Sequence, residues 1–248
     1  MTTQTVSCVT WNVHRAVGRD GRCDGARIVE AIAEDIRPAA PRILALQEAD
    51  ADDHPHGALF EGSRIEELTG LRSLHDEEDM RWGPESSGYL GNVLFLGPEF
   101  DVTSRRIVEL PGHCPRAAIL AETRIAGQAL RIVSCHLSLL QMLRVAQLRL
   151  VAQVIARRPV MQTVLLGDLN EWRPWGGLAL QPRATGLRLA GPRRSTFPSG
   201  RPVLPLDRIL TDRPEAVRNA RALSGPTVRA ASDHLPLGAE VAVQARAA

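Results

Sequence analysis

The chain has 248 residues, of which 44% are hydrophobic, and a formal net charge of +2. This length suits a well-buried core, and the small net charge means that nothing in the overall composition requires a polyanionic partner. The sequence contains no long apolar run and no secretory signal at its N-terminus, so we expect a cytoplasmic protein without a transmembrane segment. The four cysteines lack the spacing of a zinc site, and we expect reduced thiols.

The first half of the chain predicts three strands and two helices. The alternating, β-branched residues 5–12 predict the first strand. Residues 24–38 predict a helix capped by Asp24 and ended by Pro38, with three isoleucines on one face (Ile28, Ile32 and Ile36). Residues 42–48 predict the second strand, SRIE at 63–66 fits a capping box in which Ser63 begins a short helix, and residues 88–96 predict the third strand.

The second half predicts five strands and one long helix. The strands are expected at residues 117–123, 130–137, 161–168, 206–210 and 235–243. Between the second and third of these, residues 139–159 predict the helix, with its apolar face formed by Leu143, Ala146, Leu150 and Val154. Many short strands, two principal helices and no internal repeat indicate an α+β or layered α/β protein. No segment reads as a linker, so we expect a single domain over residues 1–248.

Polar side chains lie at the ends of the predicted strands. They are Asn12, Glu48, His136, Asp168, Asn170, Asp207, Asp233 and His234. Any one of them alone is more often a cap or turn residue, and Asp168 and Asn170 beside Gly167 are typical of a turn. The ends of packed strands would nevertheless bring all eight together. Amide and carboxylate oxygens suit Mg²⁺, and histidines next to carboxylates suit proton transfer near neutral pH.

Several common sites are excluded by their missing motifs. There is no H-E-x-x-H spacing and no cysteine pair for zinc. There is also no G-x-S-x-G of a serine hydrolase and no G-x-x-x-x-G-K-[ST] of a P-loop nucleotidase.

Seven short motifs in a fixed order resemble a known superfamily. The order TWNVH, LALQE, GNVLF, SCHLSL, GDLNEW, LDRIL and SDHLPL, from residue 10 to 237, is similar to the endonuclease/exonuclease/phosphatase superfamily of Mg²⁺-dependent phosphoesterases, and most of all to a compact bacterial group within it. The resemblance implies a four-layer α/β/β/α sandwich, in which two mixed β-sheets face each other and helices flank them. The site would lie at one edge, where the strand ends meet.

The resemblance also implies roles for the polar residues. Asn12, Glu48 and Asp233 would hold Mg²⁺, with Mn²⁺ able to substitute. Asp207 would orient His234, in the manner of a triad carboxylate.

The remaining catalytic positions would act on the phosphate and on water. Asp168 would position or deprotonate the attacking water, Asn170 would hold a phosphoryl oxygen, and His136 would bind the phosphate or protonate the leaving group. Whether Asp168 or His234 takes the proton stays open at this stage.

The sequence specifies the substrate contacts and the substrate class less closely than the metal and catalytic residues. Asn92, Arg116, Trp172 and Trp175 are candidates for substrate binding, and we expect Trp172 or Trp175, on a surface loop, to form a rim of the cleft. The leading hypothesis is a monomeric phosphodiesterase acting on a phospholipid or another small phosphodiester, with possible contact to a membrane surface. A DNA endonuclease or exonuclease is the main alternative, and a phosphomonoesterase or an inactive binding protein are others.

Overall fold

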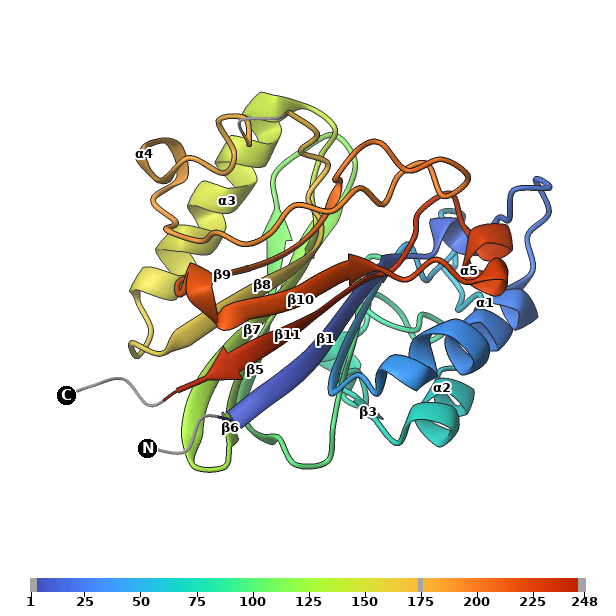
Figure 1. Cartoon of the computed structure of the whole chain (residues 1–248), viewed down its shortest axis with the longest axis horizontal. Coiled ribbons are helices and arrows are strands. Elements are labelled where there is room, and N and C mark those ends of the chain that lie inside the picture. Colours follow the sequence, from blue (N-terminus) through green and yellow to red (C-terminus); the bar gives the residue numbers. More distant parts are fainter. Residues whose placement is uncertain (1–3, 174–175, 245–248) are drawn as a thin grey trace.

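Two β-sheets lie face to face in the computed structural model, which describes residues 4–173 and 176–244 (Figure 1). The six-stranded sheet has the order β10 (Val217–Ala222), β11 (Leu237–Val243), β1 (Gln4–Asn12), β2 (Ile43–Gln47), β4 (Val93–Leu96) and β3 (Arg72–Ser73). The five-stranded sheet has the order β5 (Asp101–Leu110), β6 (Arg116–Ile125), β7 (Gln128–His136), β8 (Gln162–Asp168) and β9 (Asp207–Thr211). Each sheet contains one parallel pair, β1 with β2 and β7 with β8.

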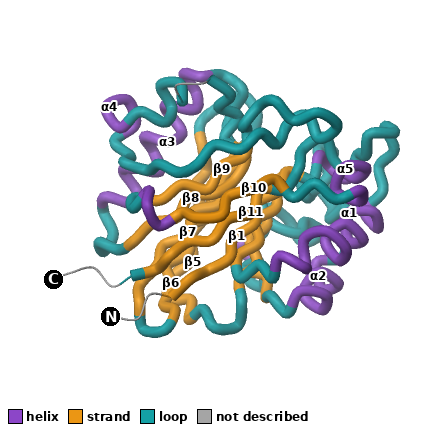
Figure 2. Tube along the Cα trace, in the orientation of Figure 1, coloured by secondary structure: helices purple, strands orange, loops and turns teal. Residues whose placement is uncertain are grey.

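Helices cover the outer faces of both sheets. The outer face of the six-stranded sheet packs against α1 (Gly25–Ala31), α2 (Gly62–Thr69) and α5 (Pro226–Ala231). The outer face of the five-stranded sheet packs against α3 (Gln141–Ala156) and α4 (Pro182–Thr185). Figure 2 shows the strands enclosed between these two helical layers. The expected four-layer α/β/β/α sandwich is therefore confirmed.

Short helical turns complete the chain. A π-helical turn at Ile32–Ile36 and a 3₁₀ turn at Arg37–Ala39 continue α1, and further 3₁₀ turns lie at His14–Ala16, Glu78–Met80 and Pro214–Ala216. The Asp24 carboxylate accepts hydrogen bonds from the backbone of Ala26 and Arg27, so the predicted cap of α1 is confirmed. In the described part of the chain, no helix is both long enough and apolar enough to cross a membrane.

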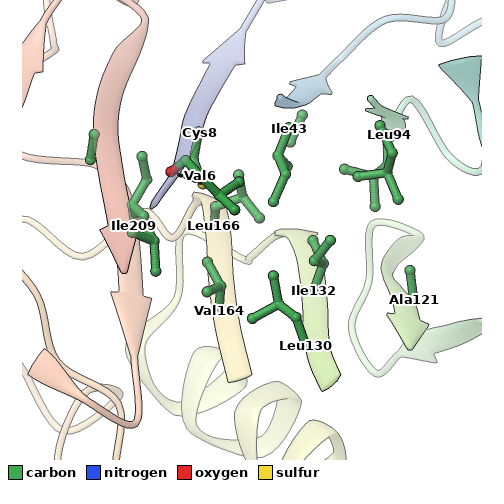
Figure 3. Close-up of a cluster of buried hydrophobic side chains, with 14 of the residues drawn as sticks. Val6, Cys8, Ile43, Leu94, Ala121, Leu130, Ile132, Val164, Leu166 and Ile209 are labelled. Carbon is green, nitrogen blue, oxygen red and sulfur yellow. Dashed lines mark hydrogen bonds between the residues drawn. The ribbon is translucent and has the colours of Figure 1, made fainter. Parts of the chain in front are cut away.

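The main core lies between the two sheets. Alternate side chains of β1, such as Val6 and Cys8, meet Leu130, Val164 and Leu166 of the opposite sheet (Figure 3). Full burial of one such aliphatic side chain contributes about 1.5–3 kcal/mol. This shared core holds the two sheets at a fixed separation.

The structure corrects the predicted buried face of the long helix. The fully buried residues of α3 are Arg144, Val145, Gln147, Leu148 and Val151, whereas Leu143, Ala146, Leu150 and Val154 are only partly buried. Arg144 lies on the buried face together with Val145, Leu148 and Val151, and it forms a buried ion pair with Glu171. Hydrophobic periodicity alone cannot register a charged side chain that faces inward.

Three other expectations differ in detail. Helix α2 begins at Gly62, before Ser63, and its N-terminus has no side-chain cap, so the capping box is wrong. The strand expected at 88–96 is confined to Val93–Leu96, because residues 89–92 form a tight turn. Strands β5 and β10 were not predicted, since both are sheet edges with many exposed, charged residues.

Candidate active site

Strand register brings the predicted catalytic residues to one edge of the sandwich. In the five-stranded sheet, His136 pairs with Asp168 across β7 and β8, and Asp168 pairs with Asp207 across β8 and β9. In the six-stranded sheet, the last residue of β1, Asn12, pairs with the residue that precedes Glu48. The site is therefore built from the ends of strands in both sheets.

Asn12 joins the two sheets at the centre of this cluster. Its amide nitrogen donates to Glu48 Oε1 at 3.1 Å and to Asp168 Oδ2 at 3.0 Å. Its amide oxygen accepts a hydrogen bond from the backbone N–H of His14 at 2.9 Å. His136 Nε2 lies 3.7 Å from Glu48 Oε1 and 3.5 Å from Asp168 Oδ2. Glu48, Asn12 and Asp168 thus form a row across the gap between the sheets.

His234 and Asp207 extend this row at the Asp168 end. His234 Nδ1 donates to Asp207 Oδ2 at 2.8 Å, and His234 Nε2 lies 3.9 Å from Asp168 Oδ2. The Thr196 hydroxyl donates to the same oxygen of Asp207. The predicted pairing of Asp207 with His234 is therefore confirmed.

The loop that carries His234 is fixed to the end of β1. The Trp11 indole N–H donates to the His234 carbonyl at 3.0 Å, and the Ser232 hydroxyl donates to the Asn12 carbonyl at 2.7 Å. Because Trp11 and Ser232 are fully buried, the position of the imidazole is coupled to that of Asn12.

The electrostatic environment separates the two groups that could accept a proton. Burial raises the pKa of Asp168 to about 6, and the nearby Asp207 adds to this rise against the opposing effect of His234. Burial acts to lower the pKa of His234, but the charge and hydrogen bond of Asp207, together with Asp168 and Asp233, raise it to about 10. The contacts with Asp207, Asp168 and Asp233 therefore favour the protonated form of His234.

His136 lies in the opposite environment. Burial lowers its pKa well below 6.5, and the positive charges of Arg116, His234 and Arg15 lower it further. The Arg116 guanidinium donates to His136 Nδ1. This contact leaves the ring neutral, with its N–H on Nε2, facing Glu48 and Asp168. His136 is thus a hydrogen-bond donor to the site.

The backbone at two site residues is left-handed. Glu48 and Asn170 have φ values of 57° and 51°, which costs energy for residues other than glycine. Gly167, in β8, has φ of 142°, and a Cβ there would lie 1.8 Å from the Cys135 carbonyl oxygen. The strand end is therefore shaped to present Asp168 and Asn170 rather than to pack side chains.

Glu48 offers the most suitable oxygen for a divalent cation. Its Oε2 is buried and accepts no hydrogen bond from the described residues, although Arg15 Nη1 lies 3.3 Å away. Asn12 presents its nitrogen to Glu48 here, so its oxygen would face the same space only after rotation of the amide. Within residues 4–173 and 176–244, no three His, Cys, Asp or Glu side chains form a metal cage. One or two carboxylates plus water and phosphate are the usual Mg²⁺ ligands, so this oxygen-rich set fits the ion.

The other predicted residues lie at different depths. Asp233 is partly exposed, with Oδ1 lying 3.7 Å from His14 Nδ1. Asn92 is fully buried and donates to the Ala117 carbonyl at 3.3 Å, so it also links the sheets. Asn170 donates to the Leu137 carbonyl at 3.0 Å. Trp172 is 49% exposed on a surface loop, as expected, whereas Trp175 lies outside the described residues.

Sequence reasoning missed a pocket beside Glu48. This pocket, with a volume of about 310 Å³, is lined by Arg15, Glu48, His56, Trp82, His113 and Arg116 among others. Its residues come from four separate loops and one strand end, and of the residues added to Glu48 only Gly91 belongs to a quoted motif. Only Arg116 was a sequence candidate for substrate binding. Below, we call this cavity the Trp82 pocket.

Arg144 forms a buried ion pair next to the site. Arg144 Nη2 lies 3.0 Å from Glu171 Oε2, and both side chains are fully buried. Arg144 Nη1 also donates to the Ser138 carbonyl at 3.0 Å. This ion pair connects the chain that follows His136 with the chain that follows Asn170, so it supports the site from outside.

Comparisons with known proteins agree with this geometry. The sequence model of the Endonuclease/Exonuclease/phosphatase family matches residues 9–234. The protein YbhP of Escherichia coli, itself uncharacterised, is 33% identical over 252 residues, covering 94% of each chain. A functionally unknown protein from Enterococcus faecalis has a similar structure, with a TM-score of 0.71, 18% identity, and coverage of 96% of this chain and 100% of that one.

A second similar structure is that of TDP2 from D. rerio complexed with a single-strand DNA product, with a TM-score of 0.66, 17% identity, and coverage of 96% and 98% of the two chains. These two structural similarities show the fold. The family match extends over nearly the whole chain and includes every strand that contributes a residue to the site. This chain belongs to the endonuclease/exonuclease/phosphatase family.

Proposed function

We propose that the protein is a metal-dependent phosphodiesterase that cleaves its substrate by in-line attack of water. The observation that carries the proposal is the row formed by Glu48, Asn12, Asp168 and His234, which has a carboxylate suited to a cation at one end and a carboxylate next to an imidazole at the other. Neutral His136, the Arg116 guanidinium and Asn170 lie close to the row and supply donors for phosphoryl oxygens.

The pKa directions support Asp168 as the group that takes the proton of the attacking water. A carboxylate whose pKa is raised toward 6 is a better base than an ordinary one, while a histidine held as a cation cannot accept a proton. The water oxygen forms a bond to phosphorus as its proton passes to Asp168. The bond from phosphorus to the ester oxygen breaks, and its electron pair leaves with that oxygen. His234⁺, fixed by Asp207, would balance the charge that builds on the phosphoryl group.

Glu48 is the residue that would hold Mg²⁺ or Mn²⁺, with Asn12 and Asp233 as further oxygen ligands. When bound, such a cation neutralises charge on phosphoryl and leaving oxygens. The buried Glu48 Oε2, with no hydrogen bond from the described residues, supports this assignment.

A phospholipid or another small phosphodiester is the substrate class that we favour. Trp172 is exposed beside Asn170, and exposed apolar residues follow His136 on the adjacent segment, namely Leu139, Leu140 and Met142. The Arg173 guanidinium lies 4.9 Å from the centre of the Trp172 ring. Apolar groups combined with arginine are suited to the interface of a membrane.

The test is hydrolysis of bis(p-nitrophenyl) phosphate by the purified protein. We expect EDTA to abolish activity, and Mg²⁺ or Mn²⁺ to restore it. Glu48→Gln should lose most activity while its circular dichroism spectrum stays unchanged, because the side chain lies at the edge of the sandwich. Full activity of Glu48→Gln, or activity that resists EDTA, would refute the metal assignment. Phospholipid vesicles and p-nitrophenyl phosphate in the same assay distinguish a lipid diesterase from a monoesterase.

A DNA nuclease is the second candidate. The observation in its favour is the similarity in fold to the D. rerio protein that was crystallised with a single-strand DNA product. Supercoiled plasmid and single-stranded oligonucleotides with Mg²⁺ test it directly. Cleavage of DNA at rates well above those for small diesters would favour this candidate over the first.

A further inference from the structure

The row of candidate catalytic residues runs from His234 through Asp168 and Asn12 to Glu48. The Trp82 pocket lies next to its Glu48 end. Asp207 and His234 stand next to Asp168 at one end. Asn12 bridges Asp168 to Glu48, and Arg15 Nη1 follows at 3.3 Å from Glu48. Arg15 and Glu48 both line the pocket, whereas Asp168 and His234 do not. The pocket therefore adjoins the Glu48 end of the row.

The aromatic wall of the Trp82 pocket is firmly positioned. The Trp82 ring makes T-shaped contacts with His56 and with Tyr89, whose ring centres lie 6.3 Å and 5.3 Å away. The Tyr89 hydroxyl donates to Glu109 of β5, and the His56 Nδ1 contacts the Ala51 carbonyl at 3.1 Å. Trp82 itself stays 39% exposed. The wall thus offers a fixed aromatic surface that the protein does not cover.

Arg116 provides a donor on the opposite wall. Its Nη1 is used by His136, but its Nε is buried and makes no hydrogen bond within the described chain. An unpaired buried donor is costly, and a ligand oxygen at this position would satisfy it. Asp50, by contrast, is already occupied, because its carboxylate accepts from the backbone of Ser87 and Gly88. Among the described residues, Arg116 Nε is therefore an unpaired donor of this cavity, suited to an oxyanion beside the unpaired Glu48 Oε2.

We infer that the Trp82 pocket binds the leaving group, and that this group carries a flat ring. The inference rests on the proposed function, since in-line displacement puts the attacking and leaving oxygens on opposite sides of phosphorus. With the attacking water held at Asp168 Oδ2, which faces His136 and His234, the departing ester oxygen lies toward Glu48 and Arg116. The rest of the leaving group then enters the pocket and stacks on Trp82. A volume of about 310 Å³ suits a single or fused ring, and it is too small for a lipid with two chains.

The substrate class that follows is a phosphodiester with unequal halves. The half that leaves is an aromatic or heterocyclic alcohol, and the half that stays on phosphorus faces Trp172. Water and the diester give a phosphomonoester and the free ring-bearing alcohol, so the reaction needs no further reactant.

The experiment uses benzyl methyl phosphate, whose two alcohols leave with similar ease. We expect the protein to release benzyl alcohol over methanol by roughly tenfold, as expected for one ring stacked on an aromatic side chain. Water labelled with ¹⁸O confirms that the bond to phosphorus is the one that breaks. Trp82→Ala should bring the ratio close to one, and Trp82→Phe should largely keep it. Val160→Ala, an exposed position remote from the site, is the matched control.

Each outcome bears on a different statement. Equal release of the two alcohols by the wild type, preferential release of methanol, or an unchanged ratio in Trp82→Ala would overturn the leaving-group assignment. If benzyl methyl phosphate is hydrolysed too slowly to measure, methyl p-nitrophenyl phosphate replaces it and the kinetic constants are compared. Trp82→Ala must then raise KM several-fold with little change in kcat, and an unchanged KM overturns the inference. Failure of the wild type to hydrolyse any diester would instead refute the proposed function.

Discussion

Asp168 combines the hydrogen bond of a turn with a carboxylate oxygen that faces the candidate site. Its Oδ1 accepts from the backbone N–H of Asn170 at 2.9 Å, which is the hydrogen bond of an ordinary Asx turn. Its Oδ2 accepts from Asn12 and faces both His136 and His234. The turn therefore fixes the carboxylate so that its second oxygen points into the site. The turn interpretation of GDLN and the catalytic one are compatible, and local sequence alone could not separate them.

Asp207→Asn tests the charge balance at the other end of the row. Asp207 is the main cause of the raised pKa of His234, so its loss should let that pKa fall from about 10 toward the ordinary value near ~6.5. We expect a loss of turnover on the order of 10⁴-fold, by analogy with a triad aspartate. NMR titration of the His234 ring measures the first effect, and kcat measures the second. An unchanged titration would show that Asp207 does not hold His234 as a cation.

Helix α3 buries one charged pair on the same face as Val145, Leu148 and Val151. Arg144 and Glu171 are both inaccessible to solvent, and Glu171 also accepts from Arg173 at 3.0 Å. Removing one partner of a buried pair leaves the other charge without full compensation. The elements around the site are thus coupled through a polar contact inside an otherwise apolar layer.

Arg144→Met should therefore lower the free energy of unfolding by about 3–5 kcal/mol. The double variant Arg144→Met with Glu171→Gln should recover part of this loss, because the uncompensated carboxylate is gone. Urea unfolding measures both. Arg157→Met, at the exposed end of α3, is the control and should change stability by less than about 0.5 kcal/mol. Strict additivity of the two single substitutions would argue against the coupling.

The connection between β3 and β4 contains a buried neutral histidine. His75 Nδ1 donates to the Met80 carbonyl at 2.6 Å, and His75 Nε2 accepts from the Leu94 N–H at 3.2 Å. Burial is the main cause that lowers its pKa to about 4. The neutral ring thus joins the 3₁₀ turn at Glu78–Met80 to the edge of the six-stranded sheet.

This histidine predicts a pH dependence of stability. The unfolded chain binds the His75 proton more readily than the folded chain, so its contribution is complete above pH ~6.5 and is lost as pH falls toward 4. The loss is on the order of 3 kcal/mol. Denaturant unfolding at pH 7 and pH 4.5 should show a larger drop for the wild type than for His75→Gln. His54→Gln, in an exposed loop, should behave as the wild type, and an equal drop in His75→Gln would contradict the prediction.

At the scale of the molecule, the sequence predicted the centre of the site better than its surroundings. Polar residues that directly follow apolar strands, such as Glu48 and Asp168, were identifiable because strand ends meet at one edge. Strands β5 and β10 were missed, since charged residues such as Arg105 and Arg218 hide the alternation of an edge strand. The Trp82 pocket was missed because loops that are distant in sequence build it, and no local pattern records which loops will meet.

Binding of a divalent cation should stabilise the whole fold. A ligand that binds only the folded state at 100 times its Kd adds about 2.7 kcal/mol to the free energy of unfolding. We therefore expect Mg²⁺ or Mn²⁺ to raise Tm of the wild type by several degrees, and EDTA to reverse the rise. Thermal unfolding followed by circular dichroism measures it without any substrate. The same rise in Glu48→Gln would show that the cation binds elsewhere.

The hydrogen bonds of Asn12 reach from one sheet to the other, and this has a consequence for the core beneath them. Glu48 is carried by the six-stranded sheet and Asp168 by the five-stranded sheet, so the distance between them depends on how thick the apolar layer is. Side chains such as Ile43 and Val164 set that thickness, although neither belongs to the catalytic row. Adding a methylene group there would widen the span across which phosphorus must be held. The packing of the apolar core between the two sheets therefore sets the distance between the two halves of the candidate site.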